Sequence, residues 1–191
     1  LVLWVMSTTA QDVRLTSTVL LVVLAIVFSM VATTQGGASD FQGISLVAFS
    51  AIVCFGIQLM AWVPASVLQT ERFYDLTGGL TYIILAVTTL MLGSGEESPG
   101  TRELLVTVLV IIWAIRLSSF LFLRIHHAGK DGRFDDLKTS PVRFLVPWSL
   151  QGLWVFVTMN VVIVINSQSG PSPSLTAWDA MGLILWTVGF C

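Results

Sequence analysis

Charged residues are scarce in this sequence. The 191 residues include only 9 Lys or Arg and 11 Asp or Glu, so that 10% of the chain is charged while 55% is hydrophobic. A soluble domain carries about 25% charged residues because its surface must face water. The composition therefore excludes an ordinary soluble globule and favours a protein whose surface lies against membrane lipids.

The sequence also lacks a basic excess, a cysteine framework and the common soluble nucleotide motifs. A net charge of -2 argues against a nucleic-acid partner, which requires a basic surface. Cys54 and Cys191 form no C-x-x-C pair, and we interpret both as small apolar residues. No G-x-G-x-x-G or G-x-x-x-x-G-K-[ST] run occurs, which excludes a Rossmann or Walker nucleotide site in these residues.

What the chain has instead is long stretches without any charge: 15–39, 41–70, 76–95 and 144–178. About 20 apolar helical residues cross a hydrocarbon core of roughly 30 Å. The hydropathy pattern predicts six spans, at 15–33, 44–62, 76–92, 104–123, 144–165 and 175–191. The predicted fold is therefore an all-α, polytopic transmembrane helix bundle.

The basic residues are distributed unevenly around these spans. Arg102 falls on one side, together with Asp40, Glu96 and Glu97. Seven others fall on the opposite side: Arg14, Arg72, Arg124, Lys130, Arg133, Lys138 and Arg143. Because Lys and Arg are retained in cytoplasmic loops, this bias predicts an integral membrane protein whose N-terminus and charged segment, from Arg124 to Arg143, face the cytosol.

Several polar side chains fall inside the predicted spans. Arg116 lies eight residues before Arg124, or roughly 12 Å into the membrane, and an intramembrane Arg is a functional candidate. Gln151 lies at a similar depth, and Asp75 opens the third span as a possible partner for Arg116. These positions indicate a polar pocket reached from the cytosol. Two alternatives to such a pocket stay open: these side chains form ordinary interhelical hydrogen bonds, and Arg116 extends to the membrane interface.

The charged segment, RIHHAGKDGRFDDLKTSPVR, allows three interpretations. It is a loop that sets topology and contacts anionic lipid, or a phosphate clamp in which Arg124, Lys130 and Arg133 bind a nucleotide, or a metal site at His126 and His127. The third is disfavoured because adjacent helical residues point about 100° apart and no further ligand stands at a suitable spacing. We therefore predict no metal site.

Four stretches look familiar together: RFYDLTGGLTYI, IIWAIRLSSFLFLRIHHAGKDGRFDDLK, WSLQGLWVFVTMNVVIVIN and WDAMGLILWTVGF. In this order they resemble a membrane protein family of unknown function, of the DUF1295 type, which is related to the steroid 5-alpha-reductases and carries their C-terminal-like domain. The resemblance covers 70–191 as one membrane domain. Residues 1–69 share with that family only two apolar spans.

The resemblance implies a seven-helix reductase fold that binds NADPH from the cytosolic side. Such enzymes reduce a C=C bond conjugated to a carbonyl in a sterol or another hydrophobic small molecule, and the eukaryotic relatives suggest the endoplasmic reticulum. It assigns cofactor-binding roles to Arg116, Arg124, Arg133 and, in the loop motif, Lys130. Tyr74, Asp75 and Gln151 would lie near the substrate pocket, and the residue that polarises the carbonyl stays unassigned.

The resemblance also leads us to expect segments beyond Cys191, namely an Asp and Gln-Lys stretch and a Ser-Arg-His-Pro-Asn-Tyr run. The expectation is thus a truncated chain that lacks the seventh helix and part of the NADPH site. Two alternatives stay open. One is a membrane methyltransferase of the isoprenylcysteine type, and the other is a non-catalytic membrane protein such as a transporter or a scaffold.

Overall fold

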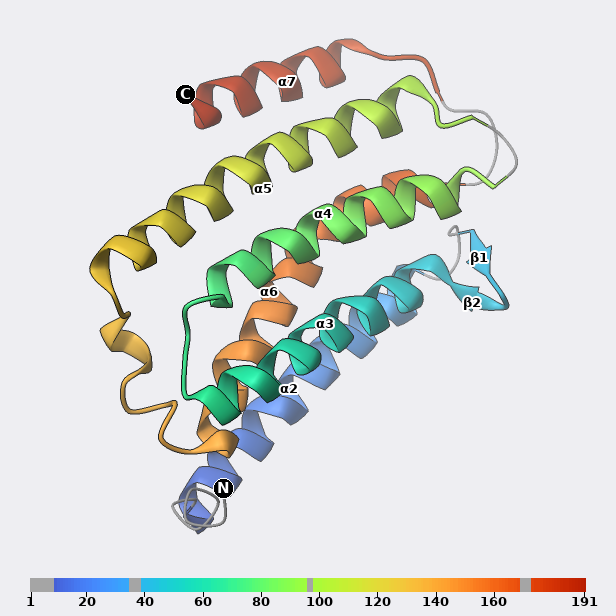
Figure 1. Ribbon diagram of the computed structural model, residues 1–191. Coiled ribbons are helices and arrows are strands. Elements are labelled where there is room, and N and C mark those ends of the chain that lie inside the picture. The colour runs from blue at the N-terminus through green and yellow to red at the C-terminus, as the bar shows by residue number, and fades with distance from the viewer. Residues whose placement is uncertain (1–8, 35–38, 96–97, 169–172) are drawn as a thin grey trace.

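The computed structural model describes residues 9–34, 39–95, 98–168 and 173–191, and these ranges are almost entirely helical (Figure 1). The α-helices are α2 (Ala10–Thr34), α3 (Leu46–Leu68), α4 (Tyr74–Gly93), α5 (Thr101–Ala128), α6 (Pro141–Asn166) and α7 (Ala177–Phe190). A 3-10 helix, η1 (Gly132–Phe134), precedes α6, and strands β1 (Asp40–Phe41) and β2 (Ile44–Ser45) form a short antiparallel hairpin before α3. The prediction of an all-α polytopic bundle is confirmed.

Five of the six predicted spans are helices long and apolar enough to cross a bilayer: α2, α3, α4, α5 and α6. The sixth differs from the prediction. It is the 14-residue helix α7, which at 1.5 Å per residue is roughly 21 Å long and falls short of a hydrocarbon core of roughly 30 Å. The described residues therefore hold five full-length spans and one shorter apolar helix.

Helix α6 is the centre of the bundle, because it packs against α2, α3 and α4 and touches α5. Its fully buried residues, such as Phe156 and Ile163, meet Cys54 of α3 and Leu85 of α4 in the main core. The outward faces are apolar as well, and Phe28 on α2 is 76% exposed. Such large exposed apolar surfaces would aggregate in water but match a lipid environment.

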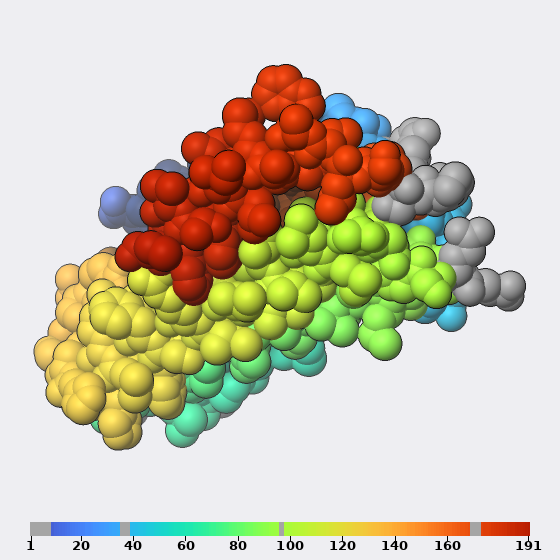
Figure 2. Space-filling view, turned by 90° about the horizontal axis from the view of Figure 1, so that it is seen from above, coloured from blue at the N-terminus to red at the C-terminus, as the bar shows by residue number. Residues whose placement is uncertain are grey.

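Helix α7 is held differently from the others, since none of its residues is buried. It lies along the outside of α5, as the space-filling view also shows (Figure 2). A bidentate ion pair joins Arg102 on α5 to Asp179 on α7, with both N–O distances 2.8 Å. At the other end of α7, the guanidinium of Arg116 donates to the carbonyl of Phe190 and lies over its ring. Polar contacts near its two ends thus attach α7.

The tethers between helices gather at two opposite ends of the bundle (Figure 1). The loop end comprises the start of α2, the α3–α4 tether and the chain between α5 and α6. The hairpin end comprises β1, β2 and the tethers after α4 and α6. The seven basic residues predicted to share one side all lie at the loop end, and Arg102 lies at the hairpin end, near the start of α5. Glu96 and Glu97 lie outside the described residues.

The sequence marks where the irregular part of the charged segment begins and ends. Helix α5 stops at Gly129, whose φ of 80° is a conformation that glycine adopts without strain. Helix α6 starts after Ser140, whose hydroxyl accepts a hydrogen bond from the amide of Arg143, and Pro141 occupies the first helical position. These signals confine the non-helical chain to a short stretch at the loop end.

Candidate functional site

A cavity of about 200 Å³ lies among α4, α5 and α6, inside the bundle. Most of its wall is apolar, and the lining residues include the polar Asp75, Tyr82, Ser118 and Gln151. Its lining is Asp75, Gly78, Gly79, Tyr82, Trp113, Ala114, Leu117, Ser118, Leu121, Gln151, Trp154 and Val155. Because Trp154 is 66% exposed, the rim of the cavity reaches the lipid-facing surface of the bundle.

Two glycines of α4 shape this cavity by letting the neighbouring helices come close. A Cβ atom on Gly79 would lie 2.3 Å from Cβ of Ser118 on α5, and one on Gly78 would lie 2.6 Å from Nε2 of Gln151 on α6. Membrane helices commonly approach one another through such small residues. The Gly78–Gly79 pair therefore sets the spacing of all three helices around the cavity.

Gln151 is fixed in orientation by its surroundings. Its Nε2 donates to the carbonyl of Tyr74 at 3.1 Å, whereas its Oε1 is buried and has no hydrogen-bond partner. A reversed amide would place Oε1 against the Tyr74 carbonyl, two acceptors facing each other, so the assigned orientation is the favourable one. The structure thus places Gln151 on the cavity wall, and its role toward a substrate stays a prediction.

Tyr74 and Asp75 are neighbours in the sequence but point to different places. Asp75 lines the cavity, whereas the hydroxyl of Tyr74 donates to the carbonyl of Pro147 at 2.8 Å. The Tyr74 ring packs against Trp148 and Phe134, with ring centroids 5.0 and 4.9 Å away. Tyr74 therefore belongs to a buried aromatic cluster that joins η1 to α4 and α6, and not to the cavity wall.

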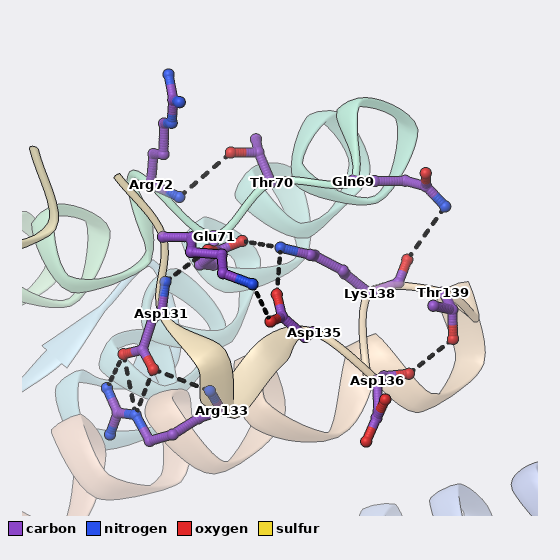
Figure 3. Close-up of polar contacts among 11 residues, drawn as sticks. Gln69, Thr70, Glu71, Arg72, Asp131, Arg133, Asp135, Asp136, Lys138 and Thr139 are labelled. Carbon is purple, nitrogen blue, oxygen red and sulfur yellow. Dashed lines mark hydrogen bonds and ion pairs between the residues drawn. The ribbon is translucent and has the colours of Figure 1, made fainter. Parts of the chain in front are cut away.

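The charged segment is organised by ion pairs among its own residues (Figure 3). Arg133 binds Asp131 through its guanidinium and its backbone amide, and Lys130 binds Asp135 at 2.7 Å. Lys138 reaches the same Asp135 at 3.1 Å. Hydrogen bonds from Arg133 lower the pKa of Asp131, and those from Lys130 and Lys138 lower the pKa of Asp135. These two carboxylates are therefore ionised at neutral pH and offset much of the positive charge.

Glu71, which the sequence analysis did not single out, holds the charged segment against the α3–α4 tether. Its side chain is 4% exposed and accepts from the backbone amide of Asp131 at 2.9 Å and from Nζ of Lys138 at 3.0 Å (Figure 3). A buried carboxylate needs such partners, because an unpaired buried charge is very costly. The available signal was its position, since Glu71 is an acid between two charge-free apolar runs.

Arg124 connects the charged segment with the cavity. Its guanidinium lies 3.8 Å from a carboxylate oxygen of Asp75 and 3.9 Å from one of Asp131. Asp75 therefore lines the cavity and also lies beside Arg124, one of the cations of the charged segment. The structure brings Arg124 and Asp75 together, and Arg133 joins them through Asp131, while Lys130 is paired with Asp135 nearby in the chain.

Arg116 is not part of this arrangement. The α5 residues that line the cavity are Trp113, Ala114, Leu117, Ser118 and Leu121, and Arg116 is not among them. Its guanidinium lies 4.4 Å from the ring centroid of Phe190 on α7. The expectation that Asp75 pairs with Arg116 is wrong, because Asp75 faces Arg124 instead. The cofactor role of Arg116 stays a prediction without support from this geometry.

Metal ligands do not gather at this site or elsewhere in the part of the chain that the structure describes, where no group of three or more His, Cys, Asp or Glu is arranged to hold an ion. His126 lies near Phe122, with stacked rings 6.3 Å apart.

A comparison with protein families returns one match for this chain. The family is described as "Protein of unknown function (DUF1295)", and its sequence profile matches residues 61–191, from the last turns of α3 to the end of α7. No curated protein and no solved structure matches the chain. The match includes the helices that enclose the cavity and the whole charged segment.

Proposed function

Because the chain belongs to the DUF1295 family and has a cavity beside a cluster of cations, we propose that it is a membrane-embedded reductase related to the steroid 5-alpha-reductases. In this proposal it uses NADPH to reduce a C=C bond conjugated to a carbonyl in a sterol or another lipid-like molecule. The cavity receives the substrate from the bilayer, and the cations at the loop end bind the phosphates of the cofactor.

The observation that carries the proposal is the position of Asp75. This residue lines an apolar cavity inside the bundle and at the same time lies 3.8 Å from Arg124. A phosphate bound by Arg124 would therefore stand next to the cavity mouth. A cofactor on the water side and a lipid-like substrate on the membrane side would meet at this point.

The cations of the charged segment are of the type that binds phosphate, provided that Asp131 moves away from them. Side chains of Arg124, Lys130 and Arg133 are 47%, 68% and 67% exposed, so a ligand in water can reach them. Guanidinium groups bind phosphate oxygens through paired hydrogen bonds. Asp131 now occupies the space between Arg124 and Arg133, so a phosphate held by both would have to take its place. Arg124 and Arg133 would hold that phosphate, and Lys130 would add a third cation.

The structure also narrows the choice of group that polarises the substrate carbonyl. NADPH, when bound, supplies a hydride to the β carbon, and a donor at the carbonyl oxygen stabilises the charge that develops there. Tyr74 already uses its hydroxyl hydrogen toward Pro147, and Gln151 uses one of its two amide hydrogens toward Tyr74. Of the three predicted pocket residues, Asp75 in its protonated form and the second amide hydrogen of Gln151 are left to donate.

Cofactor binding tests the proposal directly. The full chain in lipid nanodiscs is expected to bind NADPH saturably, and Arg133→Gln is expected to weaken binding about tenfold or more, because a charged hydrogen bond contributes about 1.5–3 kcal/mol. Asp131→Asn should instead tighten binding, since it frees Arg133 and Arg124 for phosphate. The matched control is Arg102→Gln, which removes a paired cation at the hairpin end and should leave the dissociation constant unchanged.

The alternatives give different outcomes in the same experiment. Saturable binding of S-adenosylmethionine without NADPH binding would support a methyltransferase and contradict the reductase. If neither compound binds, the proposal of a cofactor-dependent enzyme is wrong, and a non-catalytic role is left. Consumption of NADPH with a lipid-like enone, lost in Asp75→Leu and partly kept in Asp75→Asn, whose amide can still donate, would support Asp75 as the carbonyl donor.

The orientation is part of the proposal: the loop end faces the cytosol and the hairpin end faces the opposite compartment. Two matched substitutions test it in a Cys191→Ser background, Asp136→Cys at the loop end and Asp40→Cys at the hairpin end, both at exposed positions. In sealed vesicles with the cytosolic side inside, an impermeant maleimide should label the variant at Asp40 and not the one at Asp136. Equal labelling, or the reverse pattern, contradicts this orientation.

A further inference from the structure

Another cavity, of about 350 Å³, is a groove between α2 and α3. Its lining extends along α2 from Leu20 to Val27 and along α3 from Ala51 to Leu59, and α6 contributes Ser149. Helix α2 packs mainly against α6 and touches α3 little, which leaves this space between the two helices. We call it the α2–α3 groove.

The α2–α3 groove has a buried floor and exposed apolar walls. Val23, Ala51 and Ser149 are buried, and the hydroxyl of Ser149 already donates within its own helix. Leu24 and Ile52 are 63% and 62% exposed, so the groove opens toward the hydrocarbon of the bilayer. An empty space there would forfeit the van der Waals contacts of its lining. A hydrocarbon chain therefore fits this groove in polarity and in position.

The loop-end limit of the α2–α3 groove lies near the membrane surface. Helix α2 starts at the loop end and α3 stops there, so Leu20 and Leu59 form this limit (Figure 1). Trp62 follows Leu59 by three residues, and its indole N–H donates to the carbonyl of Pro141 at 3.2 Å. Tryptophans are enriched where the hydrocarbon core meets the headgroups. A lipid with its chain in the groove would thus have its headgroup at the loop end.

Arg14 is a cation at this level that is available to a ligand. It precedes Leu20 by six residues on α2, or roughly 9 Å, and the headgroup region extends roughly 5–8 Å beyond the hydrocarbon core. Its side chain is exposed, and its guanidinium makes no ion pair or hydrogen bond within the described part of the chain. The nearby carboxylate of Asp12 is paired with Arg143 at 3.5 Å. The charge of Arg14 is therefore not compensated by that acid.

We infer that the α2–α3 groove binds an acyl chain of an anionic phospholipid from the loop-end leaflet, with the lipid phosphate at Arg14. Guanidinium groups bind phosphate oxygens through paired hydrogen bonds. A zwitterionic headgroup brings its own cation to a place that already holds one, so an anionic headgroup is favoured. The bound chain fills the space between α2 and α3 and holds α2 against the bundle. This site is separate from the cavity and the cations assigned to the reductase.

Native mass spectrometry of the full chain tests the inference with two lipids that share oleoyl chains. The first molecule of phosphatidylglycerol should bind about fivefold more tightly than the first molecule of phosphatidylcholine, which is the ratio that one basic residue at the membrane surface supplies. Arg14→Gln should remove this preference. The matched control Arg72→Gln removes another exposed cation of the loop end, in the α3–α4 tether, and should leave the preference intact.

A second substitution tests whether the chain and the headgroup belong to one bound molecule. Ala51→Phe extends a side chain from the floor into the α2–α3 groove and should weaken the binding of phosphatidylglycerol. Adding Arg14→Gln to this variant should then cost nothing further, because the two changes act on one site. The rise in unfolding temperature that phosphatidylglycerol gives the unaltered chain should be lost in both single variants.

Three outcomes would overturn the inference. Equal binding of the two lipids to the unaltered chain is the first, and this comparison needs no variant to fold. The second is an equal loss of preference in Arg14→Gln and Arg72→Gln, which would assign the preference to the general charge of the loop end. The third is additive effects of Ala51→Phe and Arg14→Gln, which would show that the groove and the cation act on different molecules. None of these outcomes bears on NADPH binding, so the reductase proposal stands or fails separately.

Discussion

The two ends of the bundle are stabilised by different kinds of interaction. At the loop end, Glu71, Asp131, Asp135 and their Arg and Lys partners form a network of ion pairs that joins the charged segment to the α3–α4 tether. At the hairpin end one ion pair, between Arg102 and Asp179, attaches α7, and the contacts among α4, α5 and α6 include neutral buried ones. There the amide of Asn166 donates to the hydroxyls of Thr89 and Thr107, at 3.0 and 3.1 Å.

The difference has a functional meaning. Interactions between charges are weakened by salt, change with pH and can be exchanged for those of a charged ligand. Interactions among neutral buried amides and hydroxyls respond to none of these. In the proposed function the loop end is therefore the end assigned to an anionic cofactor, whereas the neutral contacts at the hairpin end hold the helices together.

The largest expected effect comes from removing Glu71. Glu71→Ala leaves the Asp131 amide and the Lys138 ammonium group without their buried acceptor, so the free energy of unfolding should fall by about 2–3 kcal/mol. Thermal unfolding in detergent measures it. Glu71→Gln, which keeps an acceptor for the amide, should lose less, and Asp136→Ala, at an exposed position, should lose almost nothing. A loss at Asp136 as large as that at Glu71 would show that the loop end is not organised around Glu71.

A smaller effect is expected at the hairpin end. Asn166→Leu removes the hydrogen bonds to Thr89 and Thr107, and interhelical hydrogen bonds in membrane proteins contribute about 0.6 kcal/mol on average. The loss should therefore be about 1 kcal/mol or less and should be the same in low and high salt, whereas the smaller loss from Asp135→Asn, which removes the exposed ion pair with Lys130, should shrink in high salt. Equal salt dependence of the two variants would remove the contrast between the ends.

The smallest effect is the pH dependence of the loop end. The pKa values of Asp131 and Asp135 are lower in the folded protein than the usual value of about 3.9 for an unfolded chain. Their stabilising contribution is thus fully present above about pH 5 and is lost as the pH falls through the folded values. The double variant Asp131→Asn with Asp135→Asn should show a flatter decline of stability between pH 5 and pH 3. If stability declines between pH 5 and pH 3 as steeply in the double variant as in the unaltered protein, groups other than Asp131 and Asp135 cause the acid sensitivity.

The helices and their order could be predicted from the sequence almost completely. The predicted spans 76–92 and 144–165 correspond to α4 (Tyr74–Gly93) and α6 (Pro141–Asn166), since apolar stretches of this length form helices that satisfy their own backbone hydrogen bonds in lipid. The gathering of seven basic residues at one end was also predictable, because it depends only on which tether carries each residue. The predicted sixth span, 175–191, differs from α7 by two residues at its start, because the capping box of Thr176 and Asp179 begins the helix at Ala177.

The candidate site was only partly predictable. Depth in the membrane correctly suggested that Asp75 and Gln151 share a region, since depth follows from counting residues along a helix. It did not show that Tyr74 turns toward Pro147, or that Arg116 faces α7 and not Asp75. Those outcomes depend on how each helix is rotated about its axis, which a count of residues does not give.

The sequence by itself determined that this chain is a helical membrane protein with its cations at one end, because hydropathy and charge act on each segment separately. Only the tertiary structure decided which polar groups meet. The contact of Glu71 with the amide of Asp131, the proximity of Arg124 to Asp75 and the unpaired oxygen of Gln151 all require helices to pack at a particular rotation and distance. The Gly78–Gly79 pair allows the close packing around the cavity, because a Cβ on Gly79 would lie 2.3 Å from Cβ of Ser118 on α5 and one on Gly78 would displace the Gln151 side chain of α6.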